Sequence, residues 1–260
     1  YKDKKITAIF QPHLYTRTEF GISKGTFWSP NGELLAFYRM DQSMVTDYPQ
    51  VDIPEIGFNH PETQSCIATP APDKYPMTGE TSHKVTVGVF DCMTGKTIYL
   101  KAGDPTDRYF TNIAWSPDSK TIYMFELNRD QNDCRLTAYN ADTGEKTGEL
   151  YRETDEKSVE PCHPIQFLPW DSNSFIMQSR KDGYNHLYLC TLGKHGSRMA
   201  SNTESLEIKQ LTSGKWEVME VLGFNTKRKS IIIASNEKSP IQRNIFAVDT
   251  KNGKRTLVDD

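Results

Sequence analysis

The sequence predicts an all-β protein of the β-propeller class, with about four units that each contain four short strands. A phrase with the chemistry of a tight turn recurs between strand-like runs, and a glycine turn recurs behind it. The units repeat at roughly 50 residues, which is typical of a propeller blade. Of the 260 residues, 36% are hydrophobic and many are Tyr or Phe, as expected for short, half-buried strands.

The first half of each unit is predicted to be a strand, a turn and a second strand. In the clearest copy, residues 110–115 lead through Ser116-Pro117-Asp118 into the run 121–125. Proline fixes φ in such a turn, and the Asp118 side chain closes it with a hydrogen bond. The other copies are Trp28-Ser29-Pro30-Asn31-Gly32 before 34–38, Phe167-Leu168-Pro169-Trp170-Asp171 before 174–177, and Phe224-Asn225-Thr226-Lys227 before 231–233.

The second half of each unit is predicted to be a strand, a glycine turn and a fourth strand. It is seen at 85–90, with Thr94-Gly95-Lys96 and then 97–100. It recurs at 136–140 with Thr143-Gly144-Glu145, at 244–248 with Asn252-Gly253-Lys254, and at 186–190 with a looser Leu192-Gly193 and a longer polar loop.

Composition excludes several classes of partner. The formal net charge of -3, without a basic block, gives no indication of nucleic acid or of an anionic membrane surface. No apolar run reaches the length of a membrane span, and no signal peptide begins at Tyr1. We therefore predict neither a nucleic-acid partner nor a membrane span.

No metal or cofactor site is predicted. The five cysteines form no CxxC pair, and Cys92 and Cys190 lie in or beside predicted strands, where small buried thiols are expected. The histidines are scattered, and a lone histidine is more often a hydrogen-bonded structural residue than a ligand. The cysteines are Cys66, Cys92, Cys134, Cys162 and Cys190, and the histidines considered are His60, His83, His163, His186 and His195.

Residues 1–18 do not follow the repeat and are predicted to be an atypical N-terminal segment. The strand-like run 6–10 followed by Gln11-Pro12-His13 resembles a stretch of the UDP-N-acetylmuramate alanine ligase family. Such a ligase needs a GxxxxGK[ST] phosphate-binding loop, which the sequence does not contain. The predicted domain boundaries are therefore 1–18 for this segment and 19–260 for a partial β-propeller.

One catalytic motif is present in form only. Residues 21–25 match the GxSxG nucleophile elbow, with Ser23 as the candidate nucleophile. That motif works on a strained turn between a buried strand and a helix above a parallel sheet, whereas here it leads into a β-strand. We expect no catalytic residue in this chain.

An insertion of about residues 42–82 separates the two halves of the first unit. It is rich in proline, and a long loop of this kind in a compact fold is usually functional or an extended arm. The alternative is a mobile surface loop.

Several segments together resemble the propeller domain of bacterial dipeptidyl peptidase IV. They are residues 27–32, 36–41, 75–79, 127–132, 181–188 and 212–218, which occur in the family's order. The resemblance implies part of an eight-bladed propeller capping an α/β-hydrolase domain that releases dipeptides, typically ending in Pro or Ala, from peptide N-termini. This chain would supply about half of that propeller, and the serine-hydrolase triad would lie outside it.

The resemblance also implies a substrate-binding residue, a partner and a location. In the family a pair of Glu residues before the first Trp-Ser-Pro phrase binds the substrate's free α-amino group. Glu19 stands at that place, while Arg17 and Thr18 occupy the positions where a second Glu is expected. Residues 42–82 correspond to an arm that helps to form a homodimer, and the family implies a periplasmic or cell-surface protein.

Two functional hypotheses follow. In the first, the chain is a non-catalytic propeller segment of a serine exopeptidase that gates and positions peptide N-termini for a hydrolase domain of the same protein. In the second, it is a stand-alone propeller that serves as a protein-binding scaffold, since the fold alone does not decide function.

Overall fold

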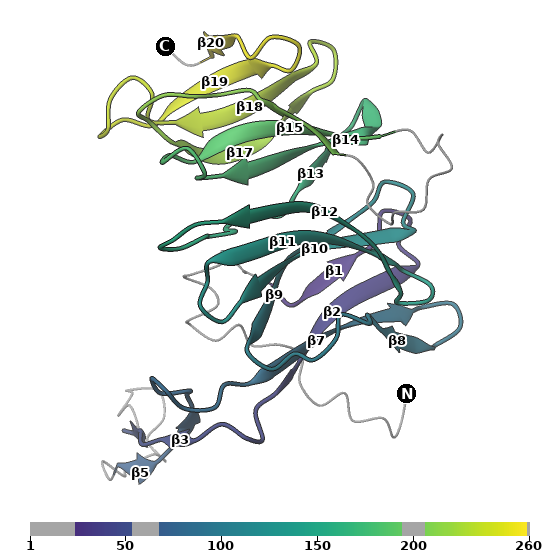
Figure 1. Cartoon of the computed structure of the whole chain (residues 1–260), viewed down its shortest axis with the longest axis vertical. Helices are drawn as coiled ribbons and strands as arrows, with labels where there is room; N and C mark the ends of the chain where they lie inside the picture. Colours follow the sequence, from purple (N-terminus) through teal and green to yellow (C-terminus); the bar gives the residue numbers. More distant parts are fainter. Residues whose placement is uncertain (1–23, 54–67, 194–205, 259–260) are drawn as a thin grey trace, which may run out of the picture.

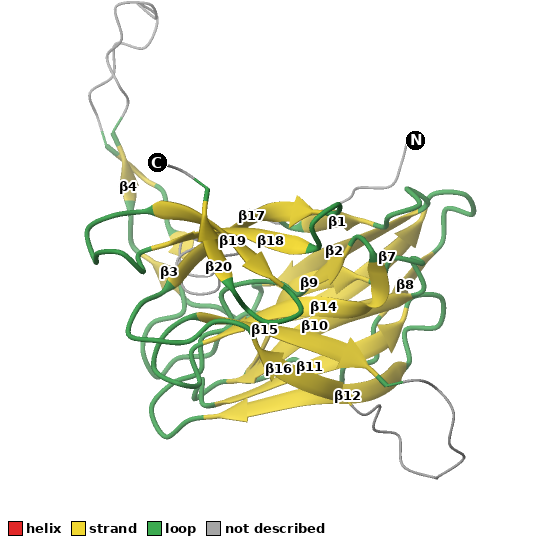
Figure 2. Cartoon of the chain, turned by 90° about the horizontal axis from the view of Figure 1, so that it is seen from above, coloured by secondary structure: helices red, strands yellow, loops and turns green. Residues whose placement is uncertain are grey.

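All regular structure in the described part of the chain is β-structure (Figures 1 and 2). The computed structural model describes residues 24–53, 68–193 and 206–258, and none of these residues is helical. No helix in these ranges is therefore long or apolar enough to cross a membrane. The predicted all-β class is confirmed.

Four antiparallel four-stranded sheets follow one another along the chain, as the repeat predicts, and each pairs its strands in chain order. Sheet 1 contains β1 (Thr26–Trp28), β2 (Leu34–Asp41), β7 (Lys84–Asp91) and β8 (Thr97–Tyr99). Sheet 2 contains β9 (Arg108–Trp115), β10 (Thr121–Asn128), β11 (Asp133–Asn140) and β12 (Lys146–Thr154). Sheet 3 contains β13 (Gln166–Leu168), β14 (Asp171–Ser179), β15 (His186–Leu192) and β16 (Leu206–Gln210). Sheet 4 contains β17 (Val218–Asn225), β18 (Ser230–Ser235), β19 (Asn244–Asp249) and β20 (Arg255–Leu257).

The serine of the repeated phrase is the centre of the turn between the first two strands. Ser116 Oγ accepts hydrogen bonds from the backbone N–H of Thr121 at 2.9 Å and of Lys120 at 3.2 Å, and donates to Asp118 Oδ1. Asp118 Oδ1 also accepts the Lys120 N–H at 3.1 Å, as the turn chemistry predicts. Ser29 has the same role in sheet 1, where its Oγ accepts the Leu34 N–H at 2.9 Å.

The glycine turns have one geometry in three of the sheets. Oδ1 of Asn140 accepts the N–H groups of Asp142 and Thr143, both at 2.9 Å, and Gly144 follows with φ +72°. Equivalent turns contain Asp91 with Gly95 (φ +70°) and Asp249 with Gly253 (φ +72°). Glycine adopts this left-handed conformation without steric cost, which explains its position in the repeat.

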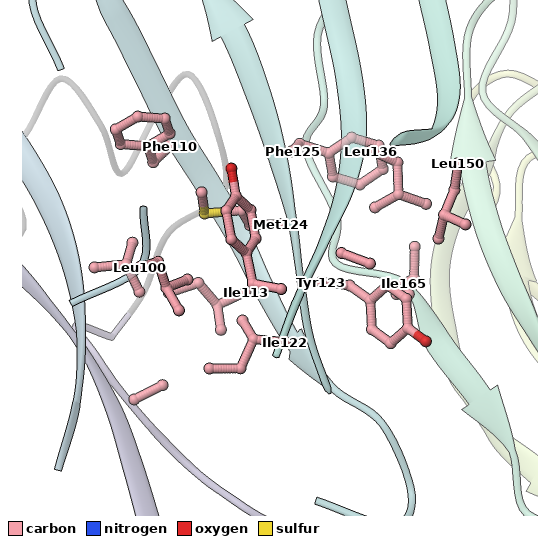
Figure 3. Packing of buried hydrophobic residues seen from close by; sticks show 14 of the residues in the cluster. Leu100, Phe110, Ile113, Ile122, Tyr123, Met124, Phe125, Leu136, Leu150 and Ile165 are labelled. Carbon is pink, nitrogen blue, oxygen red and sulfur yellow. The ribbon is translucent and has the colours of Figure 1, made fainter. Parts of the chain in front are cut away.

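Successive sheets pack face to face, and β10 is buried on both sides (Figure 3). Met124 lies with Leu100 and Ile113 on the side of sheet 1, whereas Tyr123 lies on the side of sheet 3. The Tyr123 ring is 5.5 Å from the Phe167 ring. A strand covered on both faces needs apolar residues at consecutive positions, as 122–125 provide.

Two hydrogen bonds join sheets 1 and 2 at the repeated phrase itself. Trp115 Nε1 donates to the Phe27 carbonyl at 3.0 Å, and the Asn31 N–H donates to Ser119 Oγ at 3.2 Å. The phrase therefore forms contacts between units as well as a turn within each unit.

The insertion between β2 and β7 contains a narrow ribbon that extends away from the four sheets (Figure 1). It pairs β3 (Asp47–Tyr48) with β6 (Asp73–Lys74), and β4 (Val51–Asp52) with β5 (Thr69–Pro70). Tyr48 contacts Tyr75 across the ribbon, with ring centroids 5.8 Å apart. The described part of the insertion is therefore a paired arm, whereas residues 54–67 lie outside the described ranges.

Candidate functional site

The end of the sheets that carries the arm and two further long connections is the candidate functional end. We call it the loop end and define it as the end at which β1, β9, β13 and β17 begin. The arm, the connection 155–165 and the connection 211–217 all lead to strands that start there. Glu19 and Ser23 precede β1 in the sequence and lie outside the described residues.

Arg180 connects three segments at the loop end. It follows β14 directly, and its guanidinium nitrogens lie 3.4 Å from Glu160 Oε2 and 3.2 Å from Glu217 Oε2. Glu160 belongs to the connection that enters sheet 3, and Glu217 to the connection that enters sheet 4. The Glu217 N–H also donates to Asn236 Oδ1 at 2.7 Å. These contacts hold neighbouring loops together.

The Asn112 side chain fixes the connection 155–165 to sheet 2. It lies in β9 with φ +54°, is only 5% exposed, and donates from Nδ2 to the Pro161 carbonyl. A non-glycine residue in the left-handed region is uncommon, and Asn adopts that conformation more readily than most. The Val159 N–H donates to the Gln131 carbonyl at 2.7 Å and fixes the same connection at a second point.

Neither His163 nor Cys162 in this connection is activated for chemistry. Burial, together with the charge of Arg180, lowers the pKa of His163, so its imidazole is neutral at pH 7. Burial raises the pKa of the Cys162 thiol, with Glu160 acting in the same direction, so the protonated form predominates. The connection thus offers shape and hydrogen-bonding groups without a nucleophile.

His186 is a structural residue, as expected for a lone histidine. It is completely buried, with Nδ1 3.1 Å from Thr212 Oγ1 and Nε2 3.0 Å from the Gly214 carbonyl. Its ring meets Trp216 edge-on at 4.8 Å between centroids. Both ring nitrogens are occupied, which leaves none for catalysis or metal binding.

The cysteines agree with the prediction only in part. Cys190 is buried, but Cys92 is exposed, because it lies just past the end of β7 in the turn rather than in the strand. Cys134 is buried, and Cys66 lies outside the described residues. Within the described ranges, no three His, Cys, Asp or Glu side chains are grouped as metal ligands.

A buried charge pair in sheet 2 was not predicted from the sequence. Glu126 is 4% exposed in β10, and its carboxylate binds Arg108 through Oε2 and the Tyr139 hydroxyl through Oε1. Arg108 Nη1 also donates to the Ala102 carbonyl at 2.7 Å. Burial and the Glu126 carboxylate raise the pKa of Tyr139. The pair fixes the connection between sheets 1 and 2. In the sequence, the acidic residue inside the apolar run 122–127 was the signal that could have indicated this pair.

At the opposite end, the repeated phrases of three sheets border a hollow of about 660 Å³. Trp28, Trp115 and Trp170 line it together with Pro30, Pro117 and Pro169. Trp28 is 59% exposed. Among the residues that line this hollow, no nucleophile is paired with a base.

Comparison with known proteins identifies the family and shows how much of its members this chain represents. The sequence model described as "Dipeptidyl peptidase IV (DPP IV) N-terminal region" matches residues 13–260. "Probable dipeptidyl-aminopeptidase B" of Uncinocarpus reesii is 25% identical over 90% of this chain and 26% of its own length. "Inactive dipeptidyl peptidase 10" of Rattus norvegicus is 26% identical over 86% of this chain and 27% of its own length.

Two crystal structures have the same fold. A protein of Bacteroides ovatus assigned as a dipeptidyl aminopeptidase IV is 51% identical, with a TM-score of 0.79 over 92% of this chain and 33% of its own. Dipeptidyl peptidase 4 of Porphyromonas gingivalis, at 23% identity, has a TM-score of 0.73 over 95% of this chain and 32% of its own. This chain spans about a quarter to a third of the length of these four proteins. It belongs to the dipeptidyl peptidase IV N-terminal region family.

Proposed function

We propose that this chain is the N-terminal β-propeller portion of a dipeptidyl peptidase IV-like serine exopeptidase. It supplies about four blades of an eight-bladed propeller, which gates and positions peptide N-termini for a hydrolase domain outside these 260 residues. The observation that carries the proposal is the series of four consecutive sheets with one strand order, on a chain that matches this family over residues 13–260. Four strands in each sheet with repeated turns between them are the expected blade pattern.

The loop end is suited to positioning a peptide rather than to cleaving it. Arg180 links the connections 155–165 and 211–217 through Glu160 and Glu217, and Asn112 fixes the first of them to β9. A surface whose side chains are fixed in advance loses little conformational entropy when a peptide binds. Cleavage of the peptide bond then requires a nucleophile and a base from the hydrolase domain.

Glu19 recognises the free α-amine of the peptide in this proposal. A protonated amine has three donors, and a carboxylate at the rim of a cavity binds it through charge-assisted hydrogen bonds. Each such bond contributes about 1.5 to 3 kcal/mol. A blocked or longer peptide cannot place its amine there, so this residue would let the enzyme measure two residues from the N-terminus.

Glu19→Gln in the full-length protein is expected to lower kcat/KM for a Gly-Pro chromogenic amide by about tenfold or more. An N-acetylated substrate should lose little, because it has no charged amine for Glu19 to bind. Steady-state kinetics with both substrates measures the difference. Glu33→Gln is the control, since Glu33 is an exposed carboxylate at the opposite end of β1. Equal losses on the two substrates, or none, would remove Glu19 from the amine site.

The arm mediates homodimerisation in this proposal. Tyr48, Val51 and Ile53 are 42%, 60% and 68% exposed on the ribbon and form its apolar surface. Val45, which belongs to the same insertion, is 2% exposed, and its carbonyl accepts a hydrogen bond from Lys74. Val45 therefore packs inside the chain.

Deleting residues 42–82 from the full-length protein is expected to halve its sedimentation mass. The triple variant Tyr48→Ser, Val51→Ser, Ile53→Ser should do the same without shortening the chain, because it removes exposed apolar area that only a partner would cover. Met93→Ser is the matched control, since Met93 is 78% exposed but lies in a turn of sheet 1. An unchanged mass for the deletion variant would contradict the role of the arm.

We also infer a periplasmic or cell-surface location from the family resemblance. Cell fractionation with an antibody against the full-length protein tests it, and recovery with the cytosolic markers would contradict it.

The alternative function is a stand-alone propeller that binds other proteins. The relative named "Inactive dipeptidyl peptidase 10" favours it, since that name joins this family region to a protein without activity. The gene sequence beyond Asp260 distinguishes the two functions. A GxSxG motif after a strand, followed by Asp and then His, would support the peptidase, and its absence would support the scaffold.

A further inference from the structure

The sequence contains two Asn-Gly pairs, and each lies in a turn between two strands of one sheet. Asn31-Gly32 lies between β1 and β2, and Asn252-Gly253 lies between β19 and β20 (Figure 1). Both glycines adopt a positive φ, +76° and +72°. Each glycine N–H donates to a carbonyl earlier in its own turn, that of Ser29 at 2.9 Å and that of Asp249 at 2.8 Å. The two pairs therefore differ mainly in the surroundings of the Asn side chains.

The Asn31 side chain is held in place by its turn. Its Oδ1 accepts hydrogen bonds from Ser29 Oγ at 2.7 Å and from the Glu33 N–H at 3.2 Å. Its Nδ2 donates to Glu33 Oε2 at 2.8 Å. The Asn31 N–H also donates to Ser119 Oγ of sheet 2 at 3.2 Å. Both ends of the side-chain amide are therefore bonded, and the Glu33 carboxylate places a negative charge beside it.

The Asn252 side chain is held less firmly. Within the described part of the chain, its amide forms one hydrogen bond, in which Oδ1 accepts the Lys254 N–H at 2.8 Å. The pair lies between two cations, Lys251 and Lys254. The side-chain amide of Asn252 is thus free to rotate once a single hydrogen bond is broken, and its surroundings are positively charged.

Asn252 is exposed, and its place in the turn keeps it exposed beside a neighbouring blade. Thr143 has the same place in the turn of sheet 2, directly before Gly144. Sheet 3 packs against sheet 2, yet Thr143 is exposed. A further blade that packs against sheet 4 would therefore leave Asn252 accessible to water.

We propose that Asn252 is a site of spontaneous deamidation in the folded protein and that Asn31 is protected from the same reaction. The Gly253 nitrogen attacks Cγ of Asn252, so that a C–N bond forms in a five-membered succinimide ring. The side-chain nitrogen leaves as ammonia and takes the proton of the Gly253 amide. Water then opens the ring at either carbonyl, which gives aspartate or isoaspartate. Glycine permits the attack because it has no Cβ to hinder its nitrogen. This site does not depend on the proposed peptidase function.

Charge and hydrogen bonding both favour the reaction at Asn252. The attacking nitrogen must lose its proton, and neighbouring cations favour the negatively charged form, whereas a carboxylate such as that of Glu33 disfavours it. Asn31 must break three side-chain hydrogen bonds before its Cγ can turn toward the Gly32 nitrogen, against one at Asn252. We therefore expect deamidation to be about tenfold or more faster at Asn252 than at Asn31.

The reaction would disturb the contact between sheets 3 and 4. Isoaspartate lengthens the main chain by a methylene group within the turn. Gly253 is buried, and even a Cβ at this residue would overlap the Leu211 carbonyl oxygen at the end of sheet 3. The longer chain must move the turn away from Leu211, so isoaspartate at position 252 should lower the melting temperature.

Incubation of the full-length protein at mildly alkaline pH, followed by mass spectrometry of chymotryptic peptides, tests the site. The peptide 247–257 should gain the mass that converts an amide to an acid, and the peptide 29–34 should gain it about tenfold more slowly. Enzymatic methylation of isoaspartate identifies the product. Asn252→Gln should abolish the change in 247–257, because glutamine would have to form a less favourable six-membered ring.

Two controls separate the effect of the fold from that of the sequence motif. In urea both turns are lost, so Asn31 and Asn252 should deamidate at similar rates. In the folded protein, Glu33→Ala should accelerate deamidation of Asn31, because it removes the acceptor of Nδ2 and the neighbouring carboxylate. Equal rates at Asn31 and Asn252 in the folded protein, modification of 247–257 in urea alone, or an unchanged Asn31 rate in Glu33→Ala would overturn the proposal.

Discussion

Arg108→Met is expected to destabilise the chain by about 3 kcal/mol, because it leaves the Glu126 carboxylate buried without its counter-charge. Glu126 is 4% exposed and would retain only the Tyr139 hydroxyl as a side-chain partner. The cost of an unpaired buried charge is about 3 to 5 kcal/mol, and solvent screening at Arg108, whose side chain is 32% exposed, favours the lower part of that range. Urea unfolding followed by circular dichroism measures the change.

The double variant Arg108→Met, Glu126→Leu should recover most of that loss, because it removes both charges and leaves an apolar contact. Lys101→Met is the surface control. Lys101 pairs with Glu145, but both side chains are more than half exposed, so the expected change is about 0 to 1 kcal/mol. Equal losses of unfolding free energy in Arg108→Met and Lys101→Met would contradict the stabilising role of the Arg108–Glu126 pair.

Gly144→Ala is expected to cost about 3 kcal/mol or more, for two separate reasons. Gly144 has φ +72°, where an L-residue costs about 1 to 2 kcal/mol. In addition, a Cβ at this position would overlap the Tyr99 carbonyl oxygen of sheet 1, which is backbone and cannot rotate away. The Lys101 N–H donates to the Gly144 carbonyl at 2.8 Å, so any displacement also strains an inter-sheet hydrogen bond.

The variant Gly95→Ala separates the conformational cost of a positive φ from the cost of the steric overlap. Gly95 has nearly the same φ, +70°, but a Cβ there meets no atom within 4 Å. Only the conformational cost of about 1 to 2 kcal/mol should remain. Thermal unfolding of the two variants should therefore show a clearly lower melting temperature for Gly144→Ala, and equal values would contradict the close contact between sheets 1 and 2.

The strands and turns were predictable because their signals are local. The hydroxyl of Ser116, the ring of Pro117 and the φ of Gly144 each determine the conformation of a few adjacent residues. The predicted strands 110–115, 121–125 and 136–140 consequently fall within a few residues of β9, β10 and β11. The polar turn at Asn128 is equally local, since its Oδ1 accepts the N–H groups of Asn132 and Asp133.

Other features depend on partners distant in the sequence and could not be predicted. Asn112 reaches the Pro161 carbonyl 49 positions away, and its left-handed backbone leaves no pattern in the sequence. The exposure of Cys92 follows from the end of β7 at Asp91, one residue before it. The placement of Glu19, the candidate that matters most for function, remains a prediction from family resemblance, since it lies outside the described residues.

The central claim is that the 260-residue chain selects peptide N-termini for a catalytic domain located elsewhere in the protein. It is tested most directly by measuring dipeptide release from free and N-acetylated Gly-Pro amides, with the 260-residue chain and with the full-length protein. We predict no hydrolysis by the 260-residue chain, and hydrolysis by the full-length protein with a strong preference for the free amine. Dipeptide release by the 260-residue chain that Ser23→Ala abolishes, or no amine preference in the full-length protein, would contradict the claim.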